Sequence, residues 1–426
     1  MRTRGAAPHA NEARRMALGV LALCTLMNLL SRGVSDSFAV FLLPLAHDLG
    51  GDRAALTGVY STYMLVTGLS APLAGIAFDR FGPRAVYLGG LALFGTAYLL
   101  AGSLSALWQL YVLVGACGGV GAALIGMVPA SALASRWFGT RLASAVGVLY
   151  AALGTGLLIL APLTQWLIER FGWRSAYHAL GSALLALWPL LLAMPWRRIA
   201  PGHPDYAGER MRQAARGPGA PLAHAVRSSA FWALFGVMFV TSVTTYTIGV
   251  QAVAYLIEIG FAPLKAASVY GLVGMLSVFG MLGSGMLAER YGERRIATLS
   301  YSCTIAGILA FALLQHTPAY PLLIAFVLLF GTMQGSRGPL VAVLAARLFS
   351  GAGLGTVYGT IMLGMGLGGA VGSWVAGRLH DLTGGYLAGF ALAIVGAAAG
   401  IALFWTVGAL SGRAGALSAA RRTPSG

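Results

Sequence analysis

The sequence predicts an all-α membrane protein with twelve transmembrane helices in two six-helix halves, and three observations favour this fold class. Of the 426 residues, 58% are hydrophobic and 9% are charged, whereas soluble domains carry about 25% charged residues. Apolar blocks recur along the chain, each long enough to cross ~30 Å of hydrocarbon as a helix. The third observation is a sequence repeat between the halves. An ordinary soluble enzyme is excluded, and so is an outer-membrane barrel, whose strands would alternate apolar and polar residues.

The apolar blocks define the expected helices and the domain boundaries. Short loops separate most blocks, but the interval from 196 to 229 is longer and rich in Pro and Gly. We therefore expect an N-terminal half over 1–195, a cytoplasmic linker over 196–229, and a C-terminal half with a short cytoplasmic tail over 230–426. The expected helices cover about 17–43, 56–76, 85–103, 108–134, 141–167, 174–195, 230–257, 266–287, 296–315, 320–346, 354–378 and 386–410.

Lysine and arginine residues indicate how the chain is oriented. There are 28 of them against 12 acidic residues, a net charge of +16, which in a soluble protein would raise the question of nucleic acid. Here 21 lie in loops on the side of the N-terminus and five in loops on the other side. Because cytoplasmic loops carry such an excess, we expect a multi-pass protein of the cell inner (plasma) membrane with both termini cytoplasmic and no nucleic-acid partner. The first apolar block is too long for a signal peptide, which predicts a retained helix.

Two loops repeat in the two halves. The segment 75–84 reads GIAFDRFGPR and the segment 285–295 reads GMLAERYGERR, so that the Gly, the acid, the Arg and the second Gly all recur after 210 residues. Pro129 and Pro339 recur at the same offset. Parallel six-helix repeats are typical of transporters that bind their substrate near the midplane between the halves and rock to alternate its exposure.

The repeated loop resembles the signature of the major facilitator superfamily, G-x-x-x-D-R-x-G-x-R, and the resemblance covers the whole chain. Within that superfamily, the segment 136–141 (RWFGTR), the glycines and proline that follow, and the segment 171–177 (FGWRSAY) resemble the monocarboxylate and oxalate/formate exchange branch. This resemblance implies the major facilitator fold and proton-coupled or exchange transport of small carboxylates.

The charged residues of the two loops are expected to form a gate. An acid at a cytoplasmic helix end can pair with nearby arginines or face the N-terminus of another helix, and such a cluster would hold one side of a transporter closed. The alternative is that these charges only set the topology. The candidate gate residues are Asp79, Arg80, Arg84, Glu289, Arg290 and Arg294.

Charges inside the expected helices are the best indication of a binding site, because burying them costs about 2.5 kcal/mol or more. Arg32 and Asp36 lie one turn apart on the same face as Asn28, and Arg337 follows Gln334 by three residues. A guanidinium offers a rigid fork of donors that suits a carboxylate. We therefore expect Arg32, Arg337, Gln334 and Asn28 to bind an organic anion. The alternative for Arg32 is a static ion pair with Asp36.

Asp36 is the candidate proton-coupling residue, since it is the only acid expected inside a helix near substrate depth. A bound anion that draws Arg32 away would leave its carboxylate without a counter-ion and favour protonation. Three tyrosines are further candidates for donating to the anion: Tyr150 and Tyr358, which are related by the repeat, and Tyr246. The alternative for these tyrosines is packing with a satisfied hydroxyl.

The sequence predicts neither catalytic residues nor a cofactor nor a metal site. It contains no phosphate-binding G-x-x-x-x-G-K-[ST] motif and no His, Cys and carboxylate cluster with metal spacing. We therefore expect a secondary active transporter of a small organic carboxylate, with the lipid bilayer, the anion and protons as partners. The alternatives are an exporter of hydrophobic drugs or metabolites, and a membrane sensor that does not transport. The oligomeric state is left open.

Overall fold

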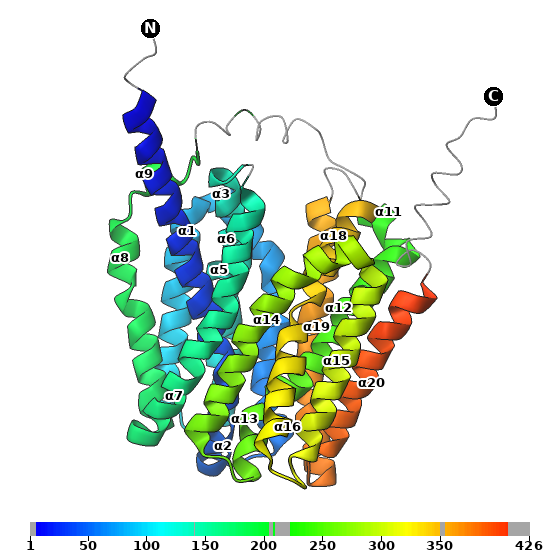
Figure 1. Cartoon of the computed structure of the whole chain (residues 1–426). Helices are drawn as coiled ribbons and strands as arrows, with labels where there is room; N and C mark the ends of the chain where they lie inside the picture. The colour runs from blue at the N-terminus through cyan, green and yellow to red at the C-terminus, as the bar shows by residue number, and fades with distance from the viewer. Residues whose placement is uncertain (1–5, 140, 204–207, 209–221, 350–353, 408–426) are drawn as a thin grey trace, which may run out of the picture.

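The fold is a bundle of long helices (Figure 1), given by a computed structural model that describes residues 6–139, 141–203, 208, 222–349 and 354–407. The helices of the first half are α1 (Ala6–Asp36), α2 (Phe38–Leu49), α3 (Arg53–Ala101), α4 (Leu107–Leu110), η1 (Tyr111–Cys117), α5 (Gly118–Ile125), α6 (Met127–Trp137), α7 (Leu142–Ala186) and α8 (Trp188–Ala193). Two short helices follow, α9 (Trp196–Ile199) and α11 (Leu222–Val226). The second half contains α12 (Ser229–Gly249), α13 (Ala252–Glu258), α14 (Pro263–Tyr291), α15 (Glu293–Leu313), α16 (Tyr320–Phe326), η3 (Val327–Gly331), α17 (Thr332–Gln334), α18 (Arg337–Leu348), α19 (Leu354–Thr383) and α20 (Leu387–Thr406).

The described residues cross the membrane twelve times, as predicted. They form ten helical stretches that are long and apolar enough to span a bilayer, some of which combine several of the helices named above. Two of these, α3 and α7, have 49 and 45 residues, or about 70 Å at ~1.5 Å per residue, which is twice the hydrocarbon thickness. Each contains a glycine with positive φ, Gly82 at 77° and Gly172 at 81°, a conformation that costs glycine little. The chain turns back at these glycines, so both stretches cross twice.

Two of the crossing helices break just before a proline. Gly126 separates α5 from α6 three residues before Pro129, and Gly335 and Ser336 separate α17 from α18 just before Pro339. Proline lacks the N–H group that would close the helical hydrogen bond, and its ring clashes with the carbonyl four residues earlier. Each of these two helices is therefore interrupted about one turn before its proline.

The interval expected to be a linker is partly helical. It contains α9 and α11, and the indole Nε1 of Trp137 donates to the carbonyl of Ile199 at 2.9 Å, which ties α9 to the end of α6. Residues 204–207 and 209–221 of the linker lie outside the described residues.

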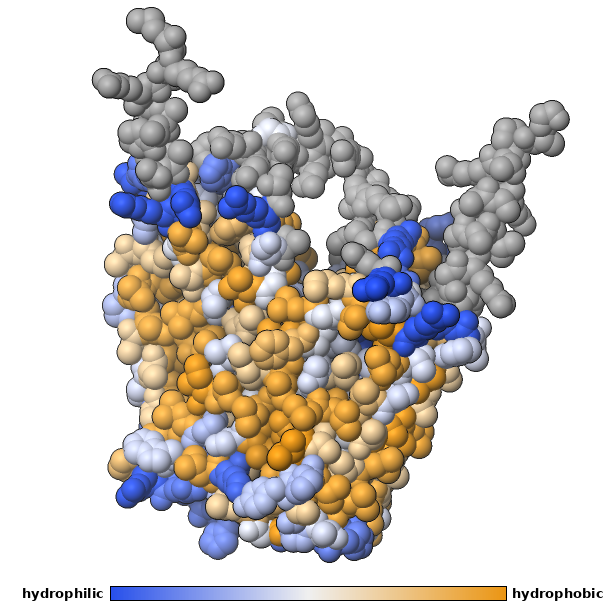
Figure 2. All heavy atoms as spheres, in the orientation of Figure 1, coloured by the Kyte–Doolittle hydropathy of each residue, from blue (hydrophilic) through white to orange (hydrophobic). Residues whose placement is uncertain are grey.

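The first and last crossing helices reach the same end of the molecule, where α1 begins and α20 ends (Figure 1). We call this end the terminal face and the opposite end, where α2 and α13 finish, the distal face. Hydrophilic side chains gather at both faces and apolar ones around the middle (Figure 2). This distribution is that of a bundle embedded in a bilayer.

Helices α3 and α19, one from each half, run antiparallel and touch from the distal face inward. Both carboxylate oxygens of Asp381 accept backbone hydrogen bonds, from Arg53 N and Ala54 N, at 2.8 Å each. Two turns further in, the hydroxyls of Ser61 and Ser373 lie 3.0 Å apart. Along these contacts the residue number on α19 falls by as much as the number on α3 rises. The contacts therefore keep a single antiparallel register. We call this set of contacts the distal seam; its further members are Thr57, Gly68, Gly366 and Gly377.

A second row of glycines on α19 faces the helix α12 of its own half. A Cβ added to Gly364, Gly368 or Gly372 would lie 2.2–2.7 Å from backbone carbonyl oxygens of α12. Small residues at this spacing let two helix backbones approach closely. Helix α19 therefore has one glycine face inside its half and another at the seam between the halves.

Candidate substrate cavity

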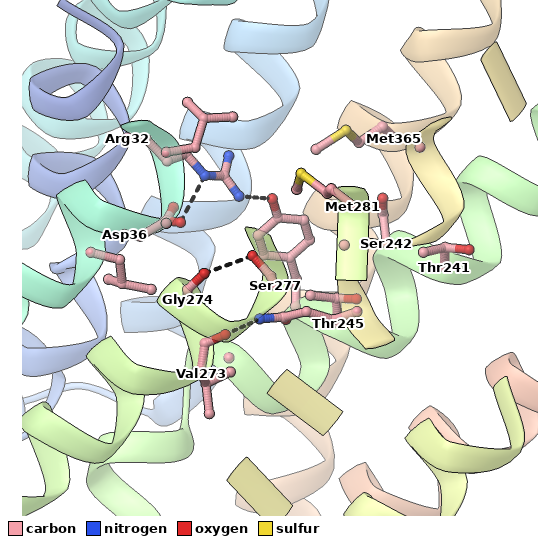
Figure 3. A pocket seen from close by; sticks show the side chains of 18 of the residues that line it. Arg32, Asp36, Thr241, Ser242, Thr245, Val273, Gly274, Ser277, Met281 and Met365 are labelled. Carbon is pink, nitrogen blue, oxygen red and sulfur yellow. Dashed lines mark hydrogen bonds and ion pairs between the residues drawn. The ribbon is translucent and has the colours of Figure 1, made fainter. Parts of the chain in front are cut away.

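A cavity of about 220 Å³ lies between the two halves (Figure 3). Its walls come from α1 and α7 of the first half and from α12, α14, α18, α19 and the segment 326–335 of the second. The polar and charged lining residues are Arg32, Asp36, Tyr150, Thr241, Ser242, Thr245, Tyr246, Tyr270, Ser277, Gln334 and Tyr358.

Arg32 and Asp36 form the ionic centre of the cavity. Arg32 Nε lies 2.8 Å from Asp36 Oδ2, an i,i+4 contact that one turn of α1 provides. Asp36 Oδ1 accepts a hydrogen bond from the hydroxyl of Tyr60 at 2.6 Å, so both carboxylate oxygens are paired. The Nη2 of Arg32 donates to the hydroxyl of Tyr246 on α12 (Figure 3). The last contact joins the two halves.

Aromatic rings surround this ion pair. The ring of Tyr60 stacks near Phe38 at 5.8 Å and lies 6.0 Å from that of Tyr246, measured between centroids. Tyr60 is 4% exposed, and Asp36 is 6% exposed. The charges are thus held in a largely dry environment, where an ionic contact is stronger than in water.

The expectation that Arg337 faces the cavity is wrong in this structure. Arg337 is fully buried and absent from the lining. Its Nη2 donates to Thr304 Oγ1 and to the carbonyl of Ser300, and its guanidinium lies 4.2 Å from the centre of the Tyr301 ring. All three partners belong to α15.

Helix geometry explains the direction of Arg337. The cavity-lining positions of this segment are Gln334, Gly335, Gly338 and Pro339, which repeat every three to four residues as one helix face does. Within α18, Gly338 and Pro339 follow Arg337 by one and two residues, which at ~100° per residue places Arg337 ~150° from the middle of the face that they share. Its Nε and Nη1 have no hydrogen-bond partner among the described residues.

Of the other predicted binding residues, one lies away from the cavity and the rest line it. Asn28 is fully buried, donates to the carbonyl of Cys24 at 2.8 Å and does not line the cavity, contrary to its expected place at the anion site. Gln334 does line it, with Nε2 donating to the carbonyl of Val273 at 3.2 Å. Tyr150 and Tyr358 also line it, one from each half.

The predicted gate residues lie at the terminal face. Asp79 pairs with Arg136 at 3.6 Å, with 81% of its own side chain exposed. In the second half the recorded pair joins Arg347 to Glu293, four residues beyond the predicted Glu289. Both pairs join helices of the same half.

The arginines of the predicted gate take no part in these two ion pairs. Arg80 and Arg290 each lie over the aromatic ring that follows them in sequence, at 5.3 and 5.4 Å from its centre. Arg84 is exposed. Arg294 lies 3.4 Å from the centre of the Trp405 ring. The side chain of Glu289 is outside what the structure describes.

The arrangement of two six-helix halves around a central cavity agrees with the family that the sequence matches. A model of the Major Facilitator Superfamily matches residues 21–373. The chain belongs to the major facilitator superfamily. Among solved structures, this facilitator is similar to the inward-open xylose transporter XylE from E. coli, with a TM-score of 0.73 at 14% identity over 91% of this chain and 95% of that one.

Proteins of similar sequence indicate the branch of the superfamily to which this chain is related. Monocarboxylate transporter 13 of Bos taurus is 27% identical over 367 residues, which cover 85% of this chain and 82% of that protein. Monocarboxylate transporter 12 of Homo sapiens is 27% identical over 403 residues, covering 88% and 77%. The uncharacterised MFS-type transporter YcxA of Bacillus subtilis is 27% identical over 386 residues, covering 84% and 87%. The facilitator is thus a membrane transporter related to the monocarboxylate transporters.

Several site residues were not predicted from the sequence. Tyr60 holds Asp36, and four methionines line the cavity: Met238, Met281, Met362 and Met365. A tyrosine or methionine in an apolar helix is usually a packing residue, so the sequence alone gave no reason to single them out.

Proposed function

We propose that this facilitator is a secondary active transporter of an organic monocarboxylate, working by alternating access as a proton symporter or as an anion antiporter. The observation that carries the proposal is Arg32, a cation in the wall of the central cavity with 26% of its side chain exposed. A substrate carboxylate can take the place of the Tyr246 hydroxyl on Nη2, because a charge-assisted hydrogen bond is stronger than a neutral one.

Charge balance favours a single negative charge on the substrate. The ionisable groups deep in the described bundle include two arginines, Arg32 and Arg337, and one acid, Asp36. This core carries an excess of one positive charge, and burying an uncompensated charge is costly. One carboxylate entering the cavity neutralises it as long as Asp36 stays ionised, as in anion exchange; in proton symport the proton and the anion together leave the net charge of the core unchanged.

Asp36 is the proposed proton carrier. A substrate that draws Arg32 away would leave the Asp36 carboxylate with the Tyr60 hydroxyl as its remaining recorded partner. Loss of a cationic neighbour favours the protonated form. Proton and anion would then cross together, which is symport.

The remaining proposals concern placement in the cell. The excess of arginine at the terminal face supports a cytoplasmic location for that face and for both termini, in the inner (plasma) membrane. Division at the linker into halves 1–195 and 230–426 follows from the twelve crossings. The charged loops that hold Asp79 and Glu289 would then form the cytoplasmic gate.

Counterflow in proteoliposomes tests the function. Vesicles loaded with unlabelled carboxylate should accumulate labelled carboxylate when wild-type protein is present. Arg32→Gln should abolish this exchange, and Arg32→Lys should weaken it because lysine lacks the planar fork. Arg378→Gln, a charge loss at an exposed position of α19, is the matched control and should leave exchange intact.

Two results would contradict the proposal. Normal exchange by Arg32→Gln at equal expression would exclude Arg32 as the anion site. Binding without exchange by the wild type would instead favour a sensor.

The mostly apolar cavity wall is the observation that favours the second candidate, an exporter of hydrophobic compounds, which would accept neutral molecules as well as acids.

A further inference from the structure

Four methionines line the same cavity as the ion pair. Met238 lies on α12, Met281 on α14, and Met362 and Met365 on α19. Methionine supplies 4 of the 28 lining residues but 14 of 426 in the chain, so the cavity is several-fold enriched in it. We call these four residues the methionine wall. All of them belong to the second half, whereas Arg32 and Asp36 belong to the first.

The methionine wall exposes apolar surface to the cavity. Met281, Met362 and Met365 are half-buried, unlike the fully packed core residues around them. In Figure 3 the side chains of Met281 and Met365 lie on the side of Arg32 where its guanidinium meets Tyr246. Methionine is flexible and polarisable, and it fits apolar ligands of varied shape. An apolar surface in this position is stabilised by an apolar occupant.

The size of the cavity leaves room for such an occupant. A cavity of about 220 Å³ is more than ten times the ~10–15 Å³ that a single water requires. It therefore has room for a carboxylate together with an apolar tail.

We propose that the substrate is an amphipathic monocarboxylate whose carboxylate binds Arg32 and whose apolar tail packs against the methionine wall. This inference rests on the proposed function and specifies its substrate class. A second carboxylate on the tail would face thioether groups, which offer it no cation and no strong hydrogen-bond donor. Dicarboxylates should therefore bind more weakly than monocarboxylates, because the lining residues of the second half include hydroxyl groups but no cation for a second carboxylate.

A chain-length series on the purified protein tests the proposal. Thermal stabilisation by acetate, propionate, butanoate, pentanoate and hexanoate gives a dissociation constant for each acid, because ligands of the native state raise its apparent stability. We expect affinity to rise about fourfold per methylene, equal to ~0.8 kcal/mol, until the wall is covered. Succinate and hexanamide should bind at least tenfold more weakly than hexanoate, since the first adds a charge and the second lacks one.

Two substitutions on α14 distinguish binding of the tail at the methionine wall from nonspecific apolar binding. Met281→Gln makes the wall polar and should flatten the chain-length dependence while acetate binding persists. Met286→Gln is the matched control, because Met286 lies on the same helix but is 70% exposed at the outer surface. It should leave the dependence unchanged.

The outcomes distinguish the two proposals. Equal affinity for acetate and hexanoate, with binding lost in Arg32→Gln, would overturn the apolar tail and leave the carboxylate transporter. Equal binding of hexanamide and hexanoate would overturn both and favour the exporter. A chain-length dependence that persists in Met281→Gln and is lost in Met286→Gln would place the tail outside the cavity and overturn the proposal.

Discussion

The two glycine faces of α19 should respond differently to the same substitution. A Cβ added to Gly377 would lie 2.2 Å from Thr57 Oγ1 and 2.7 Å from the carbonyl oxygen of Arg53, both on α3 across the seam. A Cβ added to Gly368 would lie 2.2 Å from the carbonyl oxygen of Phe239, inside the same half. The two clashes are similar, and only the first is relieved when the halves separate.

The expected effect follows from the cost of overpacking, which is about 1–3 kcal/mol. Gly368→Ala brings this cost into every conformation, so it should lower the melting temperature. Gly377→Ala brings it only into the state with a closed distal seam. At ~2 kcal/mol the ratio of closed to open distal face would fall about 30-fold, with little loss of melting temperature.

Cysteine labelling measures the opening. Ser373→Cys places a thiol in the seam, where Ser373 is fully buried, in a background that has Cys24, Cys117 and Cys303 replaced by Ala. A membrane-impermeant maleimide should label this thiol several-fold faster when Gly377→Ala is present, and Gly368→Ala should not increase the rate. Unchanged labelling together with a melting temperature lowered as much as by Gly368→Ala would refute the distinction between the two faces.

Three further predictions concern charged residues that are wholly or partly buried. Asp381→Asn replaces one acceptor oxygen with an NH₂ group that cannot accept from Arg53 N or Ala54 N, so the same seam thiol should label faster; unchanged labelling would contradict this role. Arg337→Met removes a buried cation that has no carboxylate partner among the described residues, so the melting temperature should stay the same or rise, and a marked drop would show that its bonds to α15 outweigh the cost of burial. Asp36→Asn should abolish uptake driven by a pH gradient while counterflow persists; unfolding of this variant would favour a static ion pair, and normal pH-driven uptake would exclude Asp36 as the proton carrier.

The sequence by itself determined the features that depend on local geometry. Apolar length fixes where a helix can cross a bilayer, so twelve crossings were predictable, including the two pairs in α3 and α7 that are separated by the non-helical glycines Gly82 and Gly172. Arg32 and Asp36 are four residues apart, and any α-helix brings such a pair together. The two helix breaks are also local features, because a proline disturbs the helix within about one turn of its own position.

The tertiary structure decided which way each helix faces. Periodicity groups Gln334, Gly335, Gly338 and Pro339 on one side, but only the packing of neighbouring helices shows that this side is the cavity and that Arg337 turns to α15 instead. The register of the distal seam and the partnership of Tyr60 with Asp36 are likewise contacts between helices far apart in sequence. Small residues and aromatic rings fit many neighbours equally well, so the rotation of each helix about its axis, and with it the lining of the cavity, depends on the assembled bundle.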